Sequence, residues 1–216
     1  MNGRGTKRVL ALAALLGVGL GAQAYARELG RSSIREAVFL GKNQTRSAAF
    51  LRDYIHTLPV PEKGVHVEQI EISTPFKQVV LKSRSSQGGY NPVAAVDEVE
   101  RQPPPVAVEV TLKLTPSFPA HTPYTSPVAF GAVEFRDPNF WREFQIEVAQ
   151  QGKLEPRGVQ GRPLYSCTVE GPCWLVGAVV TLEFDPAEVA SRATRVVVAT
   201  PDGQRVETEF DLGKLR

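Results

Sequence analysis

The chain has 216 residues, of which 42% are hydrophobic and 22% charged, and its formal net charge is +2. This length suits one domain that can bury a sizeable core. The weak net charge offers no concentrated basic surface, so we expect no nucleic-acid partner.

The N-terminal residues follow the pattern of a secretory leader. Basic side chains come first, an uncharged apolar stretch covers residues 9–22, and Ala24 and Ala26 then supply an A-x-A cleavage site. The basic residues are Arg4, Lys7 and Arg8. We therefore predict a signal peptide over residues 1–26.

Removal of this leader defines the mature chain, residues 27–216, and brings its charge close to neutrality. We expect an exported protein, periplasmic or extracellular, of bacterial origin, with no transmembrane span after cleavage. An uncleaved anchor is the alternative. The apolar stretch is rich in Ala and Gly, however, and short of the ~20 residues that a spanning helix needs.

Two helices are expected in the first half of the mature chain. Residues 45–58 place apolar side chains three and four positions apart, and the pattern ends at Pro59, which cannot continue a helix. Residues 91–102 begin with Asn91 as an N-cap and Pro92 at the first helical position.

Most other segments alternate apolar and polar residues, which predicts half-buried strands. In the clearest of them, residues 106–114, Val108, Val110 and Leu112 share one face. A Pro-Asp-Gly turn predicts a terminal hairpin within residues 194–212. The remaining expected strands cover residues 65–72, 76–83, 128–135, 143–150 and 175–185.

These elements predict a mainly β fold. We expect a two-sheet antiparallel β-sandwich with an immunoglobulin-like strand pattern and two or three short helices as decorations. The strands alternate in polarity, whereas the strands of a parallel sheet covered on both faces are apolar throughout.

A proline-rich loop, residues 115–127, carries three side chains that we predict as a binding surface: Phe118, His121 and Tyr124. Proline restricts the backbone, so side chains between prolines are presented at low entropic cost. The alternative is a stiff connection whose Phe118 and Tyr124 pack on the core.

The two cysteines, Cys167 and Cys173, are separated by a segment that contains Gly171 and Pro172. Gly and Pro favour a turn, and an exported pair of thiols tends to oxidise. We therefore predict a structural disulfide. A redox site would favour two intervening residues, and a zinc site would need four ligands, so both alternatives are weaker.

Recognised catalytic motifs are missing from the sequence, so we predict no catalytic residue, no cofactor and no metal site. Among the histidines, we expect His56 to lie on a helix surface and His66 to belong to an exposed polar ladder across strands. His121 is the histidine with the best prospect of a functional role, because it lies in a loop.

Three hypotheses for function follow from these features. The first is an exported, non-enzymatic binding or accessory protein whose partner is an unknown protein or component of the cell envelope or extracellular space. The second is a small exported hydrolase that uses His121 or His66 with a carboxylate. The third is a structural subunit that assembles by strand addition at an open sheet edge.

Overall fold

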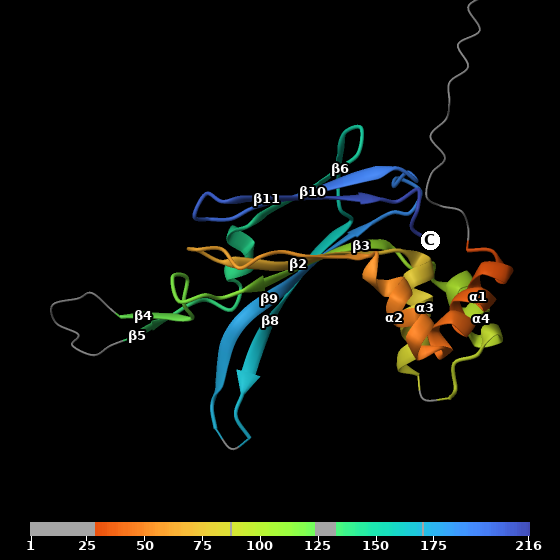
Figure 1. Cartoon of the computed structure of the whole chain (residues 1–216), viewed down its shortest axis with the longest axis horizontal. Coiled ribbons are helices and arrows are strands. Elements are labelled where there is room, and N and C mark those ends of the chain that lie inside the picture. The colour runs from red at the N-terminus through yellow and green to blue at the C-terminus, as the bar shows by residue number, and fades with distance from the viewer. Residues whose placement is uncertain (1–28, 87, 124–132, 170) are drawn as a thin grey trace, which may run out of the picture.

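The computed structural model describes residues 29–86, 88–123, 133–169 and 171–216. The predicted leader lies outside these residues. In the described part, two antiparallel sheets form the body of the molecule and the α-helices gather at one end of it (Figure 1). The predicted two-sheet, mainly β fold is confirmed.

The larger sheet has five antiparallel strands. In order across the sheet they are β1 (Ile55–Thr57), β2 (His66–Ser73), β3 (Val106–Lys113), β9 (Cys173–Phe184) and β8 (Gly158–Cys167). Strand β3 lies at the centre, and its register with β9 is regular over its whole length. Strands β1 and β8 form the two edges.

The smaller sheet has four antiparallel strands. In order they are β11 (Arg205–Asp211), β10 (Ala193–Ala199), β6 (Gln145–Ala149) and β7 (Lys153–Leu154). Strands β10 and β11 form the predicted terminal hairpin, and Gly203 in its turn has a φ of 86°, a conformation that glycine adopts without a steric penalty. A separate two-stranded hairpin pairs β4 (His121–Pro123) with β5 (Val133–Phe135). The rest of the strand predicted at residues 128–135 lies outside the described residues.

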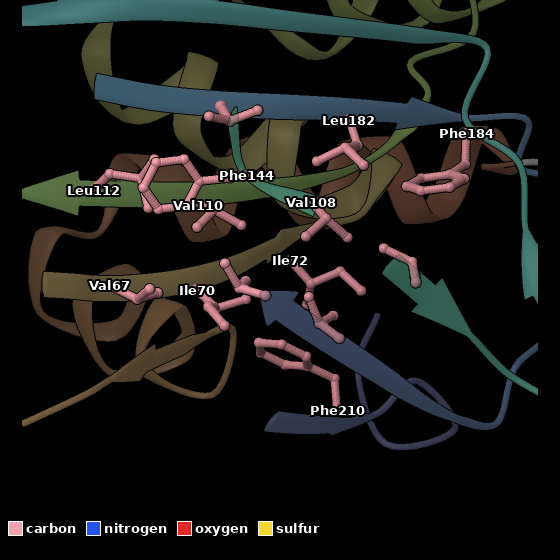
Figure 2. Close-up of a cluster of buried hydrophobic side chains, with 14 of the residues drawn as sticks. Val67, Ile70, Ile72, Val108, Val110, Leu112, Phe144, Leu182, Phe184 and Phe210 are labelled. Atoms are coloured by element: carbon pink, nitrogen blue, oxygen red, sulfur yellow. The ribbon is translucent and has the colours of Figure 1, made fainter. Parts of the chain in front are cut away.

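The main core lies between the two sheets (Figure 2). Val108, Val110 and Leu112 are buried on the inner face of β3, as predicted. Phe144, which directly precedes β6, and Phe210, on β11, belong to the same cluster and pack on it from the side of the smaller sheet. Each fully buried side chain of this size contributes roughly 1.5–3 kcal/mol, so this layer dominates the stability of the sandwich.

The α-helices pack on one another and enclose a second core. They are α1 (Arg31–Lys42), α2 (Gln44–Arg52), α3 (Pro75–Ser85) and α4 (Pro92–Arg101). Asn91 caps α4 as predicted, since its side chain accepts hydrogen bonds from two backbone N–H groups of the first turn. The buried members of the second core are Ile34, Ala37, Val38, Phe76, Val79, Val80, Ala95, Val96 and Val99.

Two local predictions are wrong. The predicted helix at 45–58 ends at Arg52, and Ile55 then begins the edge strand β1. Residues 76–83, predicted as a strand, lie in helix α3. The Thr74 side chain caps that helix by accepting the Lys77 N–H, and Pro75 occupies its first turn, so the helix has a strong start signal.

Candidate binding surface

The hairpin of β8 and β9 extends beyond the rest of the larger sheet (Figure 1). Strand β3 pairs with β9 only from Gly177 onwards, so the segment between Leu164 and Gly177 is two-stranded. This end of the sheet is opposite the helices, because β2 enters α3 at its other end. The hairpin therefore presents its tip away from the body of the protein.

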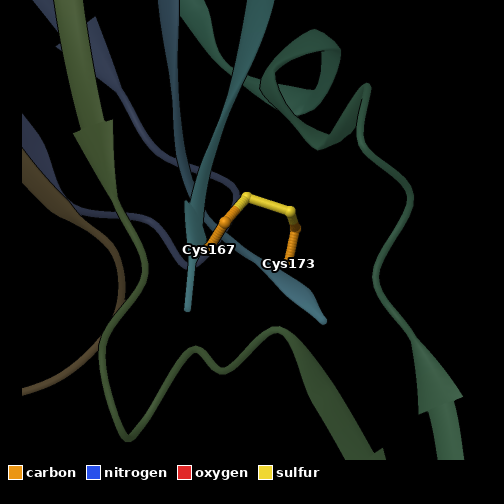
Figure 3. The surroundings of a disulfide bond; sticks show 2 residues. All are labelled: Cys167 and Cys173. Atoms are coloured by element: carbon orange, nitrogen blue, oxygen red, sulfur yellow. A yellow bond between two sulfur atoms is a disulfide. The ribbon is translucent and has the colours of Figure 1, made fainter. Parts of the chain in front are cut away.

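The predicted disulfide is present and closes this tip (Figure 3). Cys167 and Cys173 face each other as the last cross-strand pair of β8 and β9, with Cα atoms 4.1 Å apart. A covalent link at this position holds the two strand ends together where no third strand supports them. It reduces the entropy that the tip would lose when it binds.

The tip displays apolar side chains to solvent. Val169 is fully exposed, and Tyr165 and Trp174 are half-exposed, at 50% and 52%. Tyr165 is paired with Leu175, whereas Trp174 is paired with Ser166 one position along, so the two rings lie on opposite faces of the hairpin. Between residues 163 and 182 the sequence contains a single charge, Glu170.

The prediction of a binding site overlooked these tip residues, although the sequence contained the signal. Trp174 directly follows Cys173, Tyr165 lies two residues before Cys167, and the stretch is almost without charge. An ordinary solvent-exposed hairpin tip carries polar residues, so this composition makes the tip the candidate contact surface.

The predicted loop residues lie apart from the tip. Phe118 is half-buried, and its ring centroid is 6.3 Å from that of the core residue Phe140. The guanidinium of Arg136 lies 3.6 Å from the centre of the Phe118 ring. Phe118 therefore anchors its loop on the sandwich. Tyr124 lies outside the described residues.

His121 is exposed on β4, opposite Phe135. It lines a shallow pocket of about 280 Å³ that also contains three carboxylates, Glu134, Asp137 and Glu143. No serine, threonine or cysteine lines this pocket as far as the structure describes it. Within the described residues, no group of three or more His, Cys, Asp or Glu side chains is arranged to hold a metal ion.

The other two histidines have packing roles, which differs from what we predicted. His56 lies on β1 rather than on a helix, with its ring edge-on to Phe210 at 4.6 Å. His66 is buried instead of exposed, and its Nε2 is 3.0 Å from the carbonyl oxygen of Leu58. The alternation of apolar and polar residues along β2 does not reveal the burial of His66, because the connection that follows β1 covers His66 from outside the strand.

No protein-family model, curated protein or solved structure gives a significant match to this chain. Among the helices that the structure describes, none is long and apolar enough to cross a membrane.

Proposed function

We propose that the chain is an exported, non-enzymatic binding or accessory protein of the cell envelope or extracellular space, and that it contacts a partner protein through the tip of β8 and β9. The observation that carries this proposal is the pair of half-exposed rings, Tyr165 and Trp174, on a disulfide-closed hairpin.

The physical chemistry of the tip supports a protein partner. Tyr and Trp are the side chains most enriched at binding hot spots, because each buries a large area with few rotatable bonds. The disulfide limits the conformational freedom that binding would remove. Residues 163–182 contain no Lys or Arg, and these are the residues that attract proteins to anionic lipid surfaces.

Export is a separate part of the proposal, and the sequence pattern of residues 1–26 supports it. A disulfide is compatible with an oxidising compartment. N-terminal sequencing of the protein recovered from outside the cytoplasm should begin at Arg27. A product that retains Met1 and stays with the membrane fraction would contradict the cleavage.

Site-specific photocrosslinking tests the proposed contact. We would place a photoreactive phenylalanine at Tyr165 or at Trp174 in the full chain, expressed in its native host. The matched control is Phe39, which is 63% exposed on α1 at the opposite end of the molecule. We expect one discrete adduct from both tip positions and none from position 39.

Competition with purified protein completes the test. Excess wild-type protein should suppress the adduct, whereas the Tyr165→Ser/Trp174→Ser double variant should not. Adducts of equal yield from the tip and from position 39, or equal competition by the double variant, would refute the tip as the contact surface.

A further inference from the structure

The two sheets have four edges, and the structure protects them unequally. Natural proteins protect exposed edges by making them short, by charging them or by inserting proline. Strands β1 and β7 are short, with three and two residues. Strand β11 has seven residues and carries Arg205, Glu207, Glu209 and Asp211. Strand β8 is ten residues long. Its single charge, Arg162, and its proline, Pro163, both lie towards the hairpin tip, so the segment from Gly158 to Gly161 carries neither protective residue.

The outer backbone groups of β8 are available for pairing. Its register with β9 is regular from Gly158 to Leu164. Pro163 has no N–H to donate, and proline in a strand turns its nitrogen to the open side. By alternation, the N–H and C=O groups of Val159 and Gly161 also point to the open side. Among the described residues, β8 makes backbone hydrogen bonds with β9 alone.

A groove of about 510 Å³ lies beside this edge, between the two sheets. Strand β7 ends after two residues, so part of the inner face of β8 is left without a facing strand at this point. One wall comes from the larger sheet and one from the smaller. The apolar lining residues are Trp141, Phe144, Ile146, Val148, Leu154, Pro156, Val159, Val180 and Leu182.

One buried hydrogen-bond donor at this groove, the Nε1 of Trp141, has no acceptor among the described residues. The indole of Trp141 lies on Gly161, where a Cβ atom would be only 1.9 Å from the ring. Arg142 stacks on that ring at 5.4 Å and makes no ion pair in the described part of the chain. A buried donor without an acceptor is costly, so an occupant that brings acceptors would gain affinity here.

We propose that β8, from Gly158 to Arg162, accepts an extended segment of a partner protein as a sixth strand of the larger sheet. Main-chain hydrogen bonds would form along the edge, and alternate apolar side chains of the added strand would enter the groove. This inference goes beyond the proposed function, because it concerns the base of the hairpin and not its tip.

The edge and the groove together select this occupant. A small amphiphile would fill the groove and leave the edge groups unpaired. A second copy of β8, paired antiparallel about Gln160, would place Gly158 opposite Arg162. Arg162 makes no close ion pair among the described residues, although its charge acts on Glu109 of β3. An added strand that places an acidic residue opposite Arg162 therefore complements it better than Gly158 does.

A peptide array tests the proposal. The probes are peptides of about seven residues, the length of a short strand. Val, Ile, Leu or Phe occupies alternate positions, and Thr, Ser, Asp or Lys lies between them. The array is incubated with the mature chain, residues 27–216, and with two variants of it at Val159. Val159→Pro removes an edge N–H, whereas Val159→Thr keeps it; melting temperatures confirm that both variants are folded.

We expect the wild type to select peptides with an acidic residue among the polar positions. Val159→Pro should weaken the best peptide at least about tenfold, and Val159→Thr should weaken it less. Amide hydrogen exchange at Val159 and Gly161 should slow when the peptide is bound. N-methylation of the peptide amides that face β8 should abolish binding.

Several outcomes would overturn the proposal. They are the selection of no array peptide, binding that Val159→Pro leaves unchanged, and protection of amides at the hairpin tip only. If dodecanoate shifts the NMR resonances of the residues that line the groove and no peptide does so, the groove is a site for small amphiphiles. A concentration-dependent dimer that Val159→Pro abolishes would identify a second copy as the occupant. Because Tyr165 and Trp174 are unchanged in these variants, failure here leaves the tip contact to be judged by its own test.

Discussion

Tyr54 and Arg216 are 162 residues apart in the sequence and are joined by two hydrogen bonds. The Tyr54 hydroxyl donates to the backbone oxygen of Arg216 at 2.8 Å, and the Arg216 N–H donates back to that hydroxyl at 2.9 Å. The Arg216 guanidinium also binds Glu36 on α1 and lies 4.5 Å from the ring centre of Phe76 on α3. Arg216 therefore links the sandwich to the helical core.

Removing the Tyr54 hydroxyl should measure this link. Tyr54 is only 1% exposed, so Tyr54→Phe leaves the backbone groups of Arg216 without this partner. We expect a loss of about 1–3 kcal/mol in the free energy of unfolding, measured by urea denaturation. Tyr165→Phe at the exposed tip is the matched control and should change little. Equal stability of the two variants would contradict a structural role for the bond.

The same hydroxyl should affect stability at high pH. Burial raises the pKa of Tyr54 to about 12, from an ordinary value of 10.0. The folded state therefore holds this proton more tightly than the unfolded state. Its contribution is fully present below pH 10 and is lost as the pH rises towards 12. In Tyr54→Phe the fall in stability across this window should be smaller than in the wild type.

A second test concerns Glu109, which faces Glu71 directly across β2 and β3. Burial raises the pKa of the Glu109 carboxyl, the charge of Glu71 raises it further, and Lys77 and Arg162 oppose both. Lys77 is itself buried and bonds to Glu71. The ionised form of Glu109 is therefore less favourable in the folded protein than in the unfolded chain.

Glu109→Gln should consequently increase the free energy of unfolding at pH 7. A raised folded pKa favours the folded state only while the carboxyl is protonated, so the difference should disappear as the pH falls below the usual glutamate value. Urea denaturation at pH 7, and again at a pH below the usual glutamate pKa, measures the difference in the free energy of unfolding between this variant and the wild type. Glu188→Gln, at an exposed turn, is the control. A gain that persists at low pH would show that the effect is not electrostatic.

The two-sheet fold could be predicted from the sequence, whereas the helical end could be predicted only in part, because the sequence predicts α4 and the start of α2 but neither α1 nor α3. The central strand β3 carries its own signal, because Val108, Val110 and Leu112 alternate with polar residues, whereas the edge strand β8 lacks such alternation and is not predicted. Helix α2 stops short of Ile55 for a non-local reason: the Tyr54 carbonyl accepts a hydrogen bond from the Ile72 N–H on β2, and the Tyr54 hydroxyl donates to the backbone oxygen of Arg216. Apolar spacing alone continues past that point and predicts too long a helix.

The candidate site shows the same division between local and non-local information. The disulfide could be predicted from the two cysteines, the Gly171-Pro172 turn between them and the leader-like pattern of residues 1–26, all of which are read directly from the sequence. The groove beside β8 depends on how short β7 is and on which sheet lies opposite, and neither property is written in the residues of β8. The exposure of Tyr165 and Trp174 likewise depends on where β3 stops pairing.

The facing of β3 gives a direct stability test. Val110 is fully buried between the sheets, and Thr111 points to the opposite, half-exposed face. Val110→Asp would place an unpaired charge in the core, so we expect a loss of roughly 4 kcal/mol or more. Thr111→Asp should lose much less. Thermal melting distinguishes them, and equal melting temperatures would contradict the assignment of faces.

The last prediction concerns the disulfide of the hairpin tip. Cys167 and Cys173 close a ring of only a few residues, so the chain-entropy model gives about 2–3 kcal/mol of stabilisation. The tip lies beyond the last pair of β3 and β9. It supplies no buried member of either core in its described part, and Leu175 at its base packs against the main core as a partly buried residue. The Cys167→Ser/Cys173→Ser double variant should therefore remain folded, with a cooperative transition at slightly lower urea concentration. Amide exchange should quicken at residues 165–175 and stay unchanged in β3. If binding requires a pre-ordered tip, the photocrosslink at position 174 should also weaken.

Mass spectrometry of the non-reduced wild type should recover both cysteines in one linked peptide, and two free thiols in the exported protein would contradict the disulfide. Loss of the entire fold in the double variant would show that the tip is part of the core after all.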